Sequence, residues 1–531
     1  MKYAIGIDYG TESGRVILVN IANGDIVATS VTPYPHGVIT GHLYNRTLGK
    51  ETALQVPQDY LDVLAKSIPE VLTNIDPTDV IGVGLDFTSC TILPVNEELK
   101  PLCKLKQHEA NPHAYVKLWK HHEAEVEAKQ LTKIAQNEKW IQRYGGTISS
   151  EWMLPKIMEI ANDDPALFEE TAFFLEAGDW VVSKLTGSMT RNSCSAGYKG
   201  TWHKETGYIS NETLQKIHPA LDNIYNTKLA GEVKSTGTKA GTLSKEMSEL
   251  TGLREGTPIA VGIIDAHAAL PGAGVSEPGT IVIVMGTSSC HLLLSDKEVL
   301  VPGISGVVED GILPGYYAYE AGQAAVGDLF AHFVKKYNAD FQTLTEQAQV
   351  LKPGESGLLA IDWQNGCRTP YVDSTLSGLL VGEKLSTQPF EIYRALLEAT
   401  AFGTRVIIEL FESNDIPINQ VVATGGIPKK NTLLMQIYAD ILQKEITVVE
   451  NDQAPALGAA ILGAVAANAY NSFPEAINQM ASKQSVTYKP NKENEQTYNQ
   501  LFDMYQKLST YFVQQTSIMY DLHKLKGEKQ Q

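Results

Sequence analysis

The sequence has few cysteines and no long apolar segment. Only five of its 531 residues are cysteine, and no two of them form a CxxC pair. A disulfide framework and a zinc ribbon are therefore excluded. No run approaches ~18 uninterrupted apolar residues, which argues against a membrane-spanning helix. The first residues, Met1 to Asp8, read as a strand with an acid too early for a secretion signal, so we expect a cytoplasmic protein.

Positive charge is also scarce. Lys and Arg number 43 against 61 Asp and Glu, which gives a net charge of −18. Nucleic acids and anionic membranes are bound by basic surfaces, so we expect neither as a partner. An anionic nucleotide can still bind through local backbone N–H groups and a metal ion.

The common nucleotide-binding and kinase motifs are missing. No GxxxxGK[ST] segment is present, which argues against a P-loop enzyme. The protein-kinase motif set is absent as well. Gly272-Ala273-Gly274 begins a GxGxxG pattern, but Glu277 replaces its last glycine. Any nucleotide site must be built in another way.

Four histidines lie close together in one charged stretch, which raises the question of a metal site. They have no acidic partners at helical spacing, as a metal site would require. We therefore expect a solvated helix face and keep a metal site as the less favoured alternative. The histidines are His108, His113, His121 and His122.

What the sequence does contain is a repeated layout of a short β-rich run, a turn of Gly, Thr and Ser, and a second regular element. It occurs within residues 5–19, 81–93, 281–294 and 421–442. The turn Gly10-Thr11-Glu12-Ser13 matches Gly286-Thr287-Ser288-Ser289, which indicates an internal duplication, with chance similarity as the alternative.

Helical patterns alternate with these strands and predict an α/β fold. They cover residues 57–72 and 390–410, and a C-terminal stripe from Tyr498 to Phe512 is interpreted as packed core. Gly252, Gly256 and Pro258 interrupt the pattern, so we predict two domains, residues 1–255 and 256–531.

The two matching turns predict a phosphate clamp. Gly10 and Gly286 would let the backbone approach a phosphate closely, and successive turn N–H groups form an anion-binding nest. Thr11 and Thr287 would add hydroxyl donors. Either turn alone is equally well an ordinary β-hairpin; the pair favours ATP binding.

Only one of the two hairpins carries an acid for a metal ion. Asp8 ends the strand before Gly10 and could hold Mg²⁺ beside the phosphates. Val284 occupies the equivalent position before Gly286. This asymmetry suits a site for a single nucleotide.

A second backbone platform follows the strand at residues 421–423. Gly425 and Gly426 would let a flat adenine or a phosphate lie against the main chain, and Asn431 is a suitable helix N-cap. Such strand–Gly–Gly–helix turns are common, so this segment carries less weight.

Asp265 follows an apolar run, Pro258 to Ile264, which we predict to be one buried strand, and it opens a helix. The helix N-terminus would keep its carboxylate ionised at neutral pH. An ionised, fixed carboxylate suits accepting a proton from a sugar hydroxyl. A simple N-cap is an equally good interpretation of Asp265 from local sequence.

Taken in order, these motifs resemble the FGGY carbohydrate kinases across nearly the whole chain. The matching segments are Asp8 to Arg15, Trp152 to Lys156, Gly286 to Ser289, Arg394 to Glu398 and Gly425-Gly426. The resemblance implies two actin-like ATPase (ribonuclease H-like) domains with ATP and sugar in a central cleft.

The resemblance also implies roles for single residues. Asp265 would be the catalytic base and, with Asp8, would hold the metal. Gln323 and Gly327 would join the residues that bind ATP. Ile427 stands where many relatives carry a third glycine, so contacts with adenine are expected to differ.

Three further segments resemble the members that act on a ketopentose, at residues 86–89, 196–202 and 319–323. By similarity, the sugar would be contacted by Ser89, Lys199, Asp265 and Glu320. Without the resemblance, Lys199 would be interpreted as a solvated surface lysine and Glu320 as a helix-start acid.

The expected reaction is phosphorylation of L-ribulose to L-ribulose 5-phosphate in L-arabinose catabolism. Xylulose or glycerol is the alternative acceptor within the family. An actin-like ATPase that transfers no phosphoryl group is the alternative from another class. The sequence leaves the oligomeric state open, a homodimer included.

Overall fold

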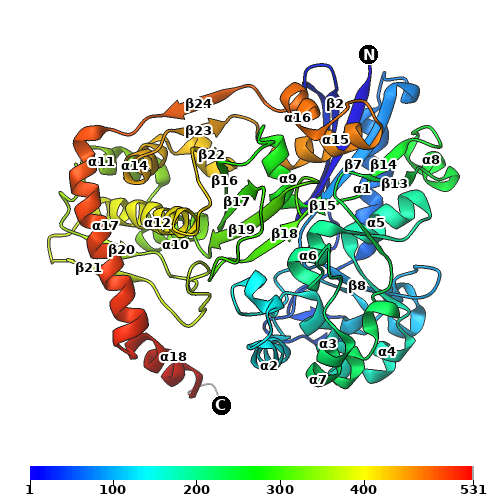
Figure 1. Ribbon diagram of the computed structural model, residues 1–531, viewed down its shortest axis with the longest axis horizontal. Helices are drawn as coiled ribbons and strands as arrows, with labels where there is room; N and C mark the ends of the chain where they lie inside the picture. The colour runs from blue at the N-terminus through cyan, green and yellow to red at the C-terminus, as the bar shows by residue number, and fades with distance from the viewer. Residues whose placement is uncertain (529–531) are drawn as a thin grey trace.

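The computed structural model describes residues 1–528 and contains two large twisted sheets, one in each half of the chain (Figure 1). The first sheet has the order β13-β14-β7-β1-β2-β3, with β15 also paired to β7. Its strands are β1 (Tyr3–Tyr9), β2 (Ser13–Asn20), β3 (Ile26–Pro33), β7 (Val80–Phe87), β13 (Lys239–Thr242), β14 (Pro258–Ala260) and β15 (Ile263–Ile264).

The second sheet has the order β18-β19-β17-β16-β22-β23-β24. Its strands are β16 (Thr280–Met285), β17 (Ser289–Ser295), β18 (Gly306–Glu309), β19 (Tyr317–Gln323), β22 (Gln420–Thr424), β23 (Ile446–Val449) and β24 (Ser485–Tyr488).

The two sheets repeat one topology. β1 pairs antiparallel with β2 and parallel with β7, and β16 pairs antiparallel with β17 and parallel with β22. In the first sheet β14 runs parallel to β7, and in the second β23 runs parallel to β22. Each sheet then ends in an antiparallel edge strand, β13 beside β14 and β24 beside β23. The internal duplication expected from the two Gly-Thr turns is confirmed, and it extends over whole sheets.

Helices surround both sheets. Those of the first half are α1 (Pro57–Val71), α2 (Glu125–Ala135), α3 (Met153–Asp163), α4 (Pro165–Glu170), α5 (Ala177–Thr186), α6 (Ser193–Gly200), α7 (Asn211–Ile217), α8 (Lys245–Thr251) and α9 (Asp265–Gly272). Those of the second half are α10 (Gly327–Tyr337), α11 (Phe341–Gln349), α12 (Pro389–Glu412), α13 (Gly426–Lys430), α14 (Thr432–Leu442), α15 (Ala454–Ala466), α16 (Phe473–Met480), α17 (Glu495–Thr510) and α18 (Ile518–Glu528). The described chain contains no helix that is both long and apolar enough to cross a membrane.

A smaller sheet extends the first half on the side of α3 and α6. It has the order β10-β8-β9-β6, from β6 (Leu54–Gln55), β8 (Ile92–Val95), β9 (Val116–Lys117) and β10 (Phe173–Glu176). Its own apolar cluster includes Ile92, Trp152 and Phe174.

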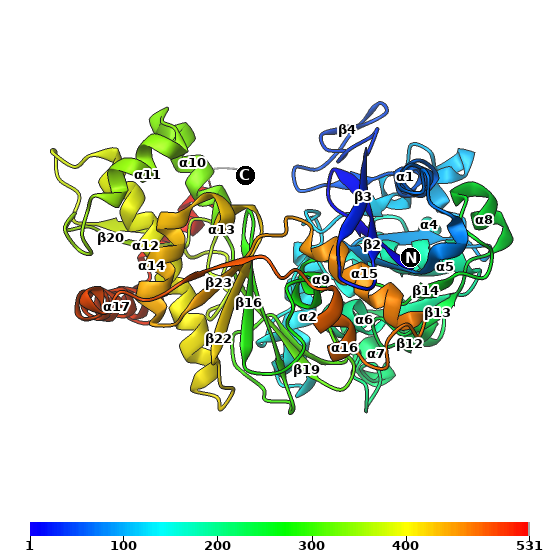
Figure 2. The same ribbon diagram turned by 90° about the horizontal axis from the view of Figure 1, so that it is seen from above.

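Two helices join the halves where they meet, α9 and α15 (Figure 2). α15 comes late in the chain but packs on the first sheet, where a Cβ on Gly6 or Gly84 would lie 2.0 Å from a backbone oxygen of α15. A Cβ on Gly272 of α9 would lie 1.9 Å from the backbone oxygen of Ala454. One apolar cluster contains residues of both large sheets and of both helices, so the two halves share packed core where they meet.

The domain division and one strand differ from expectation. β14 and β15 belong to the first sheet, so that sheet continues beyond residue 255. We therefore place the division between α9 and β16 rather than between residues 255 and 256. The single strand expected over residues 258–264 is broken at Val261-Gly262, because only its two ends pair with β7.

Candidate active site

Three carboxylates meet at the carboxyl end of the first sheet. Asp8 lies on β1, opposite Asp86 of the parallel neighbour β7. Ile263 of β15 pairs with Asp86, so Asp265 follows at the adjoining strand end as the first residue of α9. Asp8 accepts one hydrogen bond, 3.3 Å, from Nη1 of Arg15.

Asp86 is a site residue that the sequence motifs did not single out. It is fully buried, and neither of its carboxylate oxygens has a hydrogen-bond donor among the described residues. Burial, together with the charges of Asp8 and Asp265, raises the pKa of Asp86 well above its usual range. A buried carboxylate without a donor, beside two more acids, is an arrangement that a cation would stabilise.

The pKa of Asp265 is raised, whereas the helix N-terminus alone was expected to lower it. Loss of contact with water, followed by the nearby charge of Asp8, raises the pKa of Asp265 to about 7. The backbone N–H of Ala266 donates a 2.6 Å hydrogen bond to its carboxylate, which opposes this shift. Burial and the charge of Asp8 therefore outweigh the helix N-terminus, and the pKa of Asp265 lies well above its ordinary range. It is also not an N-cap, since Ile264 occupies that position.

The two hairpins differ in length by one residue. Tyr9 pairs with Gly14 across the first loop, whereas Met285 pairs with Ser289 across the second. Ser289 therefore corresponds to Gly14 and not to Ser13. Asp8 and Val284 do occupy equivalent positions, each one residue before the last pair, so a single hairpin carries the acid.

Each hairpin is held by a different neighbour. In the first, the side-chain oxygen of Thr11 accepts a 3.1 Å hydrogen bond from the indole N–H of Trp119, and Gly10 N donates to Ser13 O at 3.0 Å. In the second, Thr287 O accepts hydrogen bonds from the backbone N–H groups of Val326 and Asp328 at 2.9 and 3.1 Å.

The second hairpin contacts two other glycines that are expected to bind ATP. Gly327 N donates to Gly286 O at 3.1 Å, and a Cβ on Gly327 would lie 2.9 Å from the Ile427 side chain. Gly425 has a φ of 108° and lies against Met285, whose oxygen would be 2.3 Å from an added Cβ. The structure thus brings Gly286, Gly327 and Gly425 together.

Two expected ATP ligands have side chains that are already engaged. Asn431 caps α14, accepting from Leu434 N at 2.9 Å, as expected, and its amide also donates to the Tyr393 hydroxyl. Gln323 is buried, and its amide nitrogen donates to Asp362 and to the backbone oxygen of Thr400. Its amide oxygen accepts from Ser289 and Thr404. Both residues support the hairpin and platform from within the second half.

A buried ion pair spans the two halves beside Asp265. Lys199, near the end of α6, places Nζ 3.0 Å from Oε2 of Glu320 on β19. Burial opposes the charged forms, yet the pair holds the pKa of Glu320 well below and that of Lys199 above their usual ranges. The interpretations of Lys199 as a surface residue and Glu320 as a helix-start acid are therefore wrong.

Aromatic side chains and one histidine enclose this pair. Lys199 Nζ lies 5.6 Å from the centre of the Trp152 ring. His267 of α9, also not singled out by sequence, places Nε2 3.4 Å from Oε2 of Glu320. The Ser89 turn lies between β7 and β8. Burial raises the pKa of the neighbouring Cys90 thiol to about 12, and the charge of Lys199 opposes this shift.

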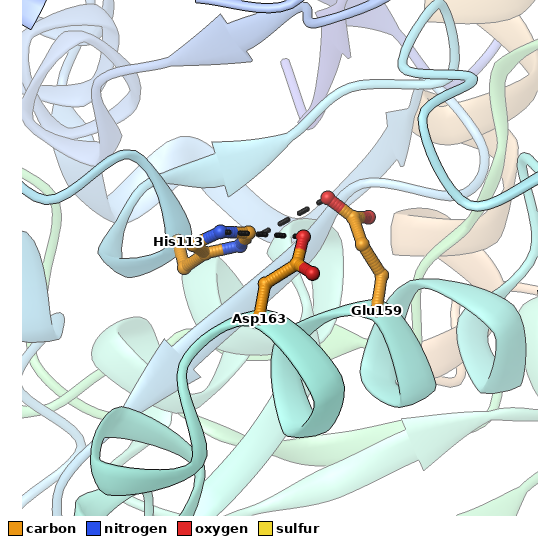
Figure 3. Close-up of side chains that lie close together, drawn as sticks. All are labelled: His113, Glu159 and Asp163. Carbon is orange, nitrogen blue, oxygen red and sulfur yellow. Dashed lines mark ion pairs between the residues drawn. The ribbon is translucent and has the colours of Figure 1, made fainter.

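Two of the four histidines are buried, which contradicts the expected solvated helix face for those two, whereas His108 and His122 are partly exposed. His113 and His121 are 8% and 1% exposed. His113 lies between Glu159 and Asp163 of α3, 3.9 Å from an oxygen of each (Figure 3). Lys117 already supplies a positive charge 2.7 Å from Glu159, so we interpret this cluster as an ion-pair network and not as a metal centre.

Comparison with known proteins shows the class of protein that this fold and site define. The model for the N-terminal domain of the FGGY family of carbohydrate kinases matches residues 3–272, and that for the C-terminal domain matches residues 281–467. The chain belongs to this family and is an ATP-dependent carbohydrate kinase.

Individual relatives are similar over nearly their whole length. A ribulokinase of Geobacillus thermodenitrificans is 51% identical over 96% of this chain and 94% of its own. A ribulokinase of Staphylococcus aureus is 44% identical over 99% of this chain and 100% of its own.

Solved structures confirm the fold of two actin-like domains. A ligand-bound xylulose kinase from Lactobacillus acidophilus has a TM-score of 0.82 at 18% identity, covering 97% of this chain and 99% of its own. A glycerol kinase of Plasmodium falciparum with ADP has a TM-score of 0.79 at 18% identity, covering 97% and 99%.

Proposed function

We propose that the protein transfers the γ-phosphoryl group of ATP to the 5-hydroxyl of L-ribulose, giving L-ribulose 5-phosphate in L-arabinose catabolism. The substrate follows from relatives named ribulokinase at 44% and 51% identity. The observation that carries the proposal is the buried Lys199–Glu320 pair beside Asp265. A filament or chaperone ATPase has no need for such a polar pocket.

Asp265 is the proposed catalytic base. The hydroxyl oxygen of the sugar forms a bond to the γ-phosphorus, the bond from that phosphorus to the bridging oxygen breaks, and ADP leaves with the electron pair. The hydroxyl proton passes to the Asp265 carboxylate. A carboxyl whose pKa is about 7 is well matched to accepting this proton near neutral pH.

The sugar is held by the ion pair and its neighbours. Lys199 donates to hydroxyl or carbonyl oxygens of the ketopentose, and Glu320 accepts from its hydroxyls. Ser89 closes the pocket from the first half. Because Lys199 and Glu320 come from different halves, sugar binding favours the closed cleft, which excludes water from the reaction.

Mg²⁺ fits the three acids at the end of the first sheet. We propose that Asp8 and Asp265 hold it, with Asp86 buried beside them, where a bound cation would favour its ionised form. When bound, the metal would neutralise charge on the β- and γ-phosphates.

The phosphates and the adenosine are proposed to lie on the glycine turns. Gly10 and Thr11 approach from the first half, and Gly286, Thr287 and Gly327 from the second. Gly425 and Gly426 form the platform for the adenosine. Ile427 lines it where it packs against Gly327.

A bulky side chain at Gly426 is expected to block this platform without disturbing the fold. No atom lies within 4 Å of a Cβ built at Gly426, whereas one at Gly425 would meet backbone at 2.3 Å. We expect Gly426→Leu to raise KM for MgATP about tenfold or more, equivalent to ~1.4 kcal/mol. Initial rates at varied ATP, with the melting temperature as a check, measure this. An unchanged KM would remove Gly426 from the ATP site.

A panel of acceptors tests the proposed function. ADP release with MgATP is followed with L-ribulose, D-ribulose, xylulose and glycerol, and kcat/KM is ranked. We expect L-ribulose to rank first. A preference for xylulose or glycerol would indicate the activity of another member of the family. ADP release at the same rate with and without an acceptor would indicate an ATPase that transfers no phosphoryl group.

A further inference from the structure

Arg368 is an arginine whose guanidinium has no partner among residues 1–528. It lies on the loop between β20 (Leu359–Ile361) and β21 (Leu379–Val381) and is half-buried. Within the described chain its guanidinium makes no side-chain hydrogen bond or ion pair. The acids nearest in sequence are engaged elsewhere, Asp362 by Tyr505 and Gln323, and Asp373 by Thr375.

Arg368 lies beside Gly322 of β19, a strand that runs from Glu320 towards the second phosphate hairpin. A Cβ on Gly322 would lie 3.5 Å from both Cδ and Nη1 of Arg368. Gly322 is two residues from Glu320 on β19, on the same face of the sheet, which corresponds to about 6–7 Å along a strand. Gly322 also pairs with Cys290, only three residues beyond Thr287.

The groups of the proposed mechanism surround the same spot. Burial raises the pKa of the Cys290 thiol; the charges of Glu320 and Asp265 raise it further, and those of Arg368 and Lys199 lower it. The Cys290 thiol thus lies within the electrostatic reach of Arg368, of the Lys199–Glu320 pair and of Asp265. The backbone fixes its loop there, because Thr369 N donates to Gly322 O at 3.2 Å and Thr369 Oγ1 accepts from Gly322 N at 3.2 Å.

The balance of acidic and basic side chains around the cleft indicates a role for Arg368. Asp8, Asp86, Asp265 and Glu320 face the cleft, and the cations Arg15 and Lys199 are each already bound to one of them. A triphosphate entering this site needs another positive charge. A guanidinium offers five planar donors that match phosphate oxygens. Arg368 also borders a cavity of about 350 Å³ beside α12 and α17, which gives its side chain room to move.

We propose that Arg368 binds the phosphoryl group as it moves from ATP to the sugar, and so acts as a catalytic residue. This inference rests on the proposed function of the same cleft. Phosphoryl transfer is catalysed mainly by positioning and by positive charge on the equatorial oxygens. Arg368 supplies that charge from the second half of the chain, on the side of the cleft opposite to Asp8.

Arg368→Ala tests the proposal, with Arg368→Gln as a longer, uncharged variant and the exposed Arg254→Ala as a matched control. We expect kcat to fall about 10²–10³-fold, as for loss of one transition-state donor. KM for MgATP and ribulose should change only a few-fold. The melting temperature of each variant reports on folding, and Arg254→Ala should behave as wild type.

Two readouts separate a catalytic role from a structural one. Free guanidinium ion, far below unfolding concentrations, should restore part of the activity of Arg368→Ala but not of Asp265→Asn. Binding of MgADP with aluminium fluoride and ribulose, measured by calorimetry, should weaken by a factor similar to that in kcat, while a non-hydrolysable ATP analogue binds nearly as in wild type.

Each other result would overturn the proposal. A near-normal kcat of Arg368→Ala would do so. A loss of kcat that guanidinium does not restore, with unchanged binding of MgADP and aluminium fluoride, would indicate a structural residue. A change confined to KM for ribulose would make Arg368 a sugar ligand. Wild-type protein inactive with every acceptor would instead refute the proposed function, so the two failures are distinguishable.

Discussion

Asp265→Asn is expected to abolish phosphoryl transfer almost completely. The amide keeps the shape of the carboxyl group but cannot accept the hydroxyl proton, and a positioned base typically contributes about 10²–10⁴ in rate. Since the glycine turns hold the phosphates and Asp8 remains to hold the metal, affinity for MgATP should stay within a few-fold of wild type. Steady-state rates with ribulose and calorimetric titration of the nucleotide measure the two quantities.

The same substitution should not destabilise the protein. The neutral amide removes one of the three crowded acids at the end of the first sheet, and burial together with Asp8 already disfavours ionised Asp265. We therefore expect a melting temperature equal to or above that of wild type, as often found when a strained functional group is replaced. Near-normal turnover in Asp265→Asn would show that the base is another residue.

Asp415→Asn is the matched control for this substitution. Asp415 is exposed and has a φ of 59°, a left-handed conformation that Asn also adopts readily. It lies in the turn after α12, outside the cleft residues. Activity, nucleotide affinity and melting temperature should all match wild type.

The sequence predicted the parts of the site that depend on local chain geometry. Gly10-Thr11 and Gly286-Thr287 could be recognised because a tight turn between two β-runs has its own residue pattern. The equivalence of Asp8 and Val284 followed from the same pattern and agrees with strand register. The family motifs then gave the order of the elements, and with it the fold.

The features of the site that the sequence did not predict depend on which strands and helices become neighbours. Asp86 meets Asp8 only because β1 and β7 pair in parallel at one register, over a separation of more than seventy residues. The pKa of Asp265 depends on burial and on the nearby charge of Asp8, so a local argument from the helix N-terminus missed the direction of its shift. Burial of His113 and His121 likewise follows from the packing of α3 and could not be read from their charged surroundings.

The Lys199–Glu320 pair offers the second large effect, on stability and on sugar binding together. Removing one partner of a buried ion pair typically costs about 3–5 kcal/mol, because the other charge stays buried. Lys199→Met should therefore lower the urea midpoint of unfolding strongly, and Glu320→Gln should do the same by leaving Lys199 unpaired beside Trp152. Both variants should also lose activity, which alone cannot separate folding from sugar recognition.

The double variant Lys199→Met/Glu320→Gln separates the two roles. With both charges removed no buried charge is left uncompensated, so most of the lost stability should return. If the pair also holds the sugar, two charge-assisted hydrogen bonds of about 1.5–3 kcal/mol each are still missing. The value of kcat/KM for ribulose should then stay about 10²-fold or more below wild type, while KM for MgATP is nearly normal. A double variant that regains both stability and ribulose activity would make the pair a structural tie between the two halves, and the sugar would have to be held by other residues of the cleft.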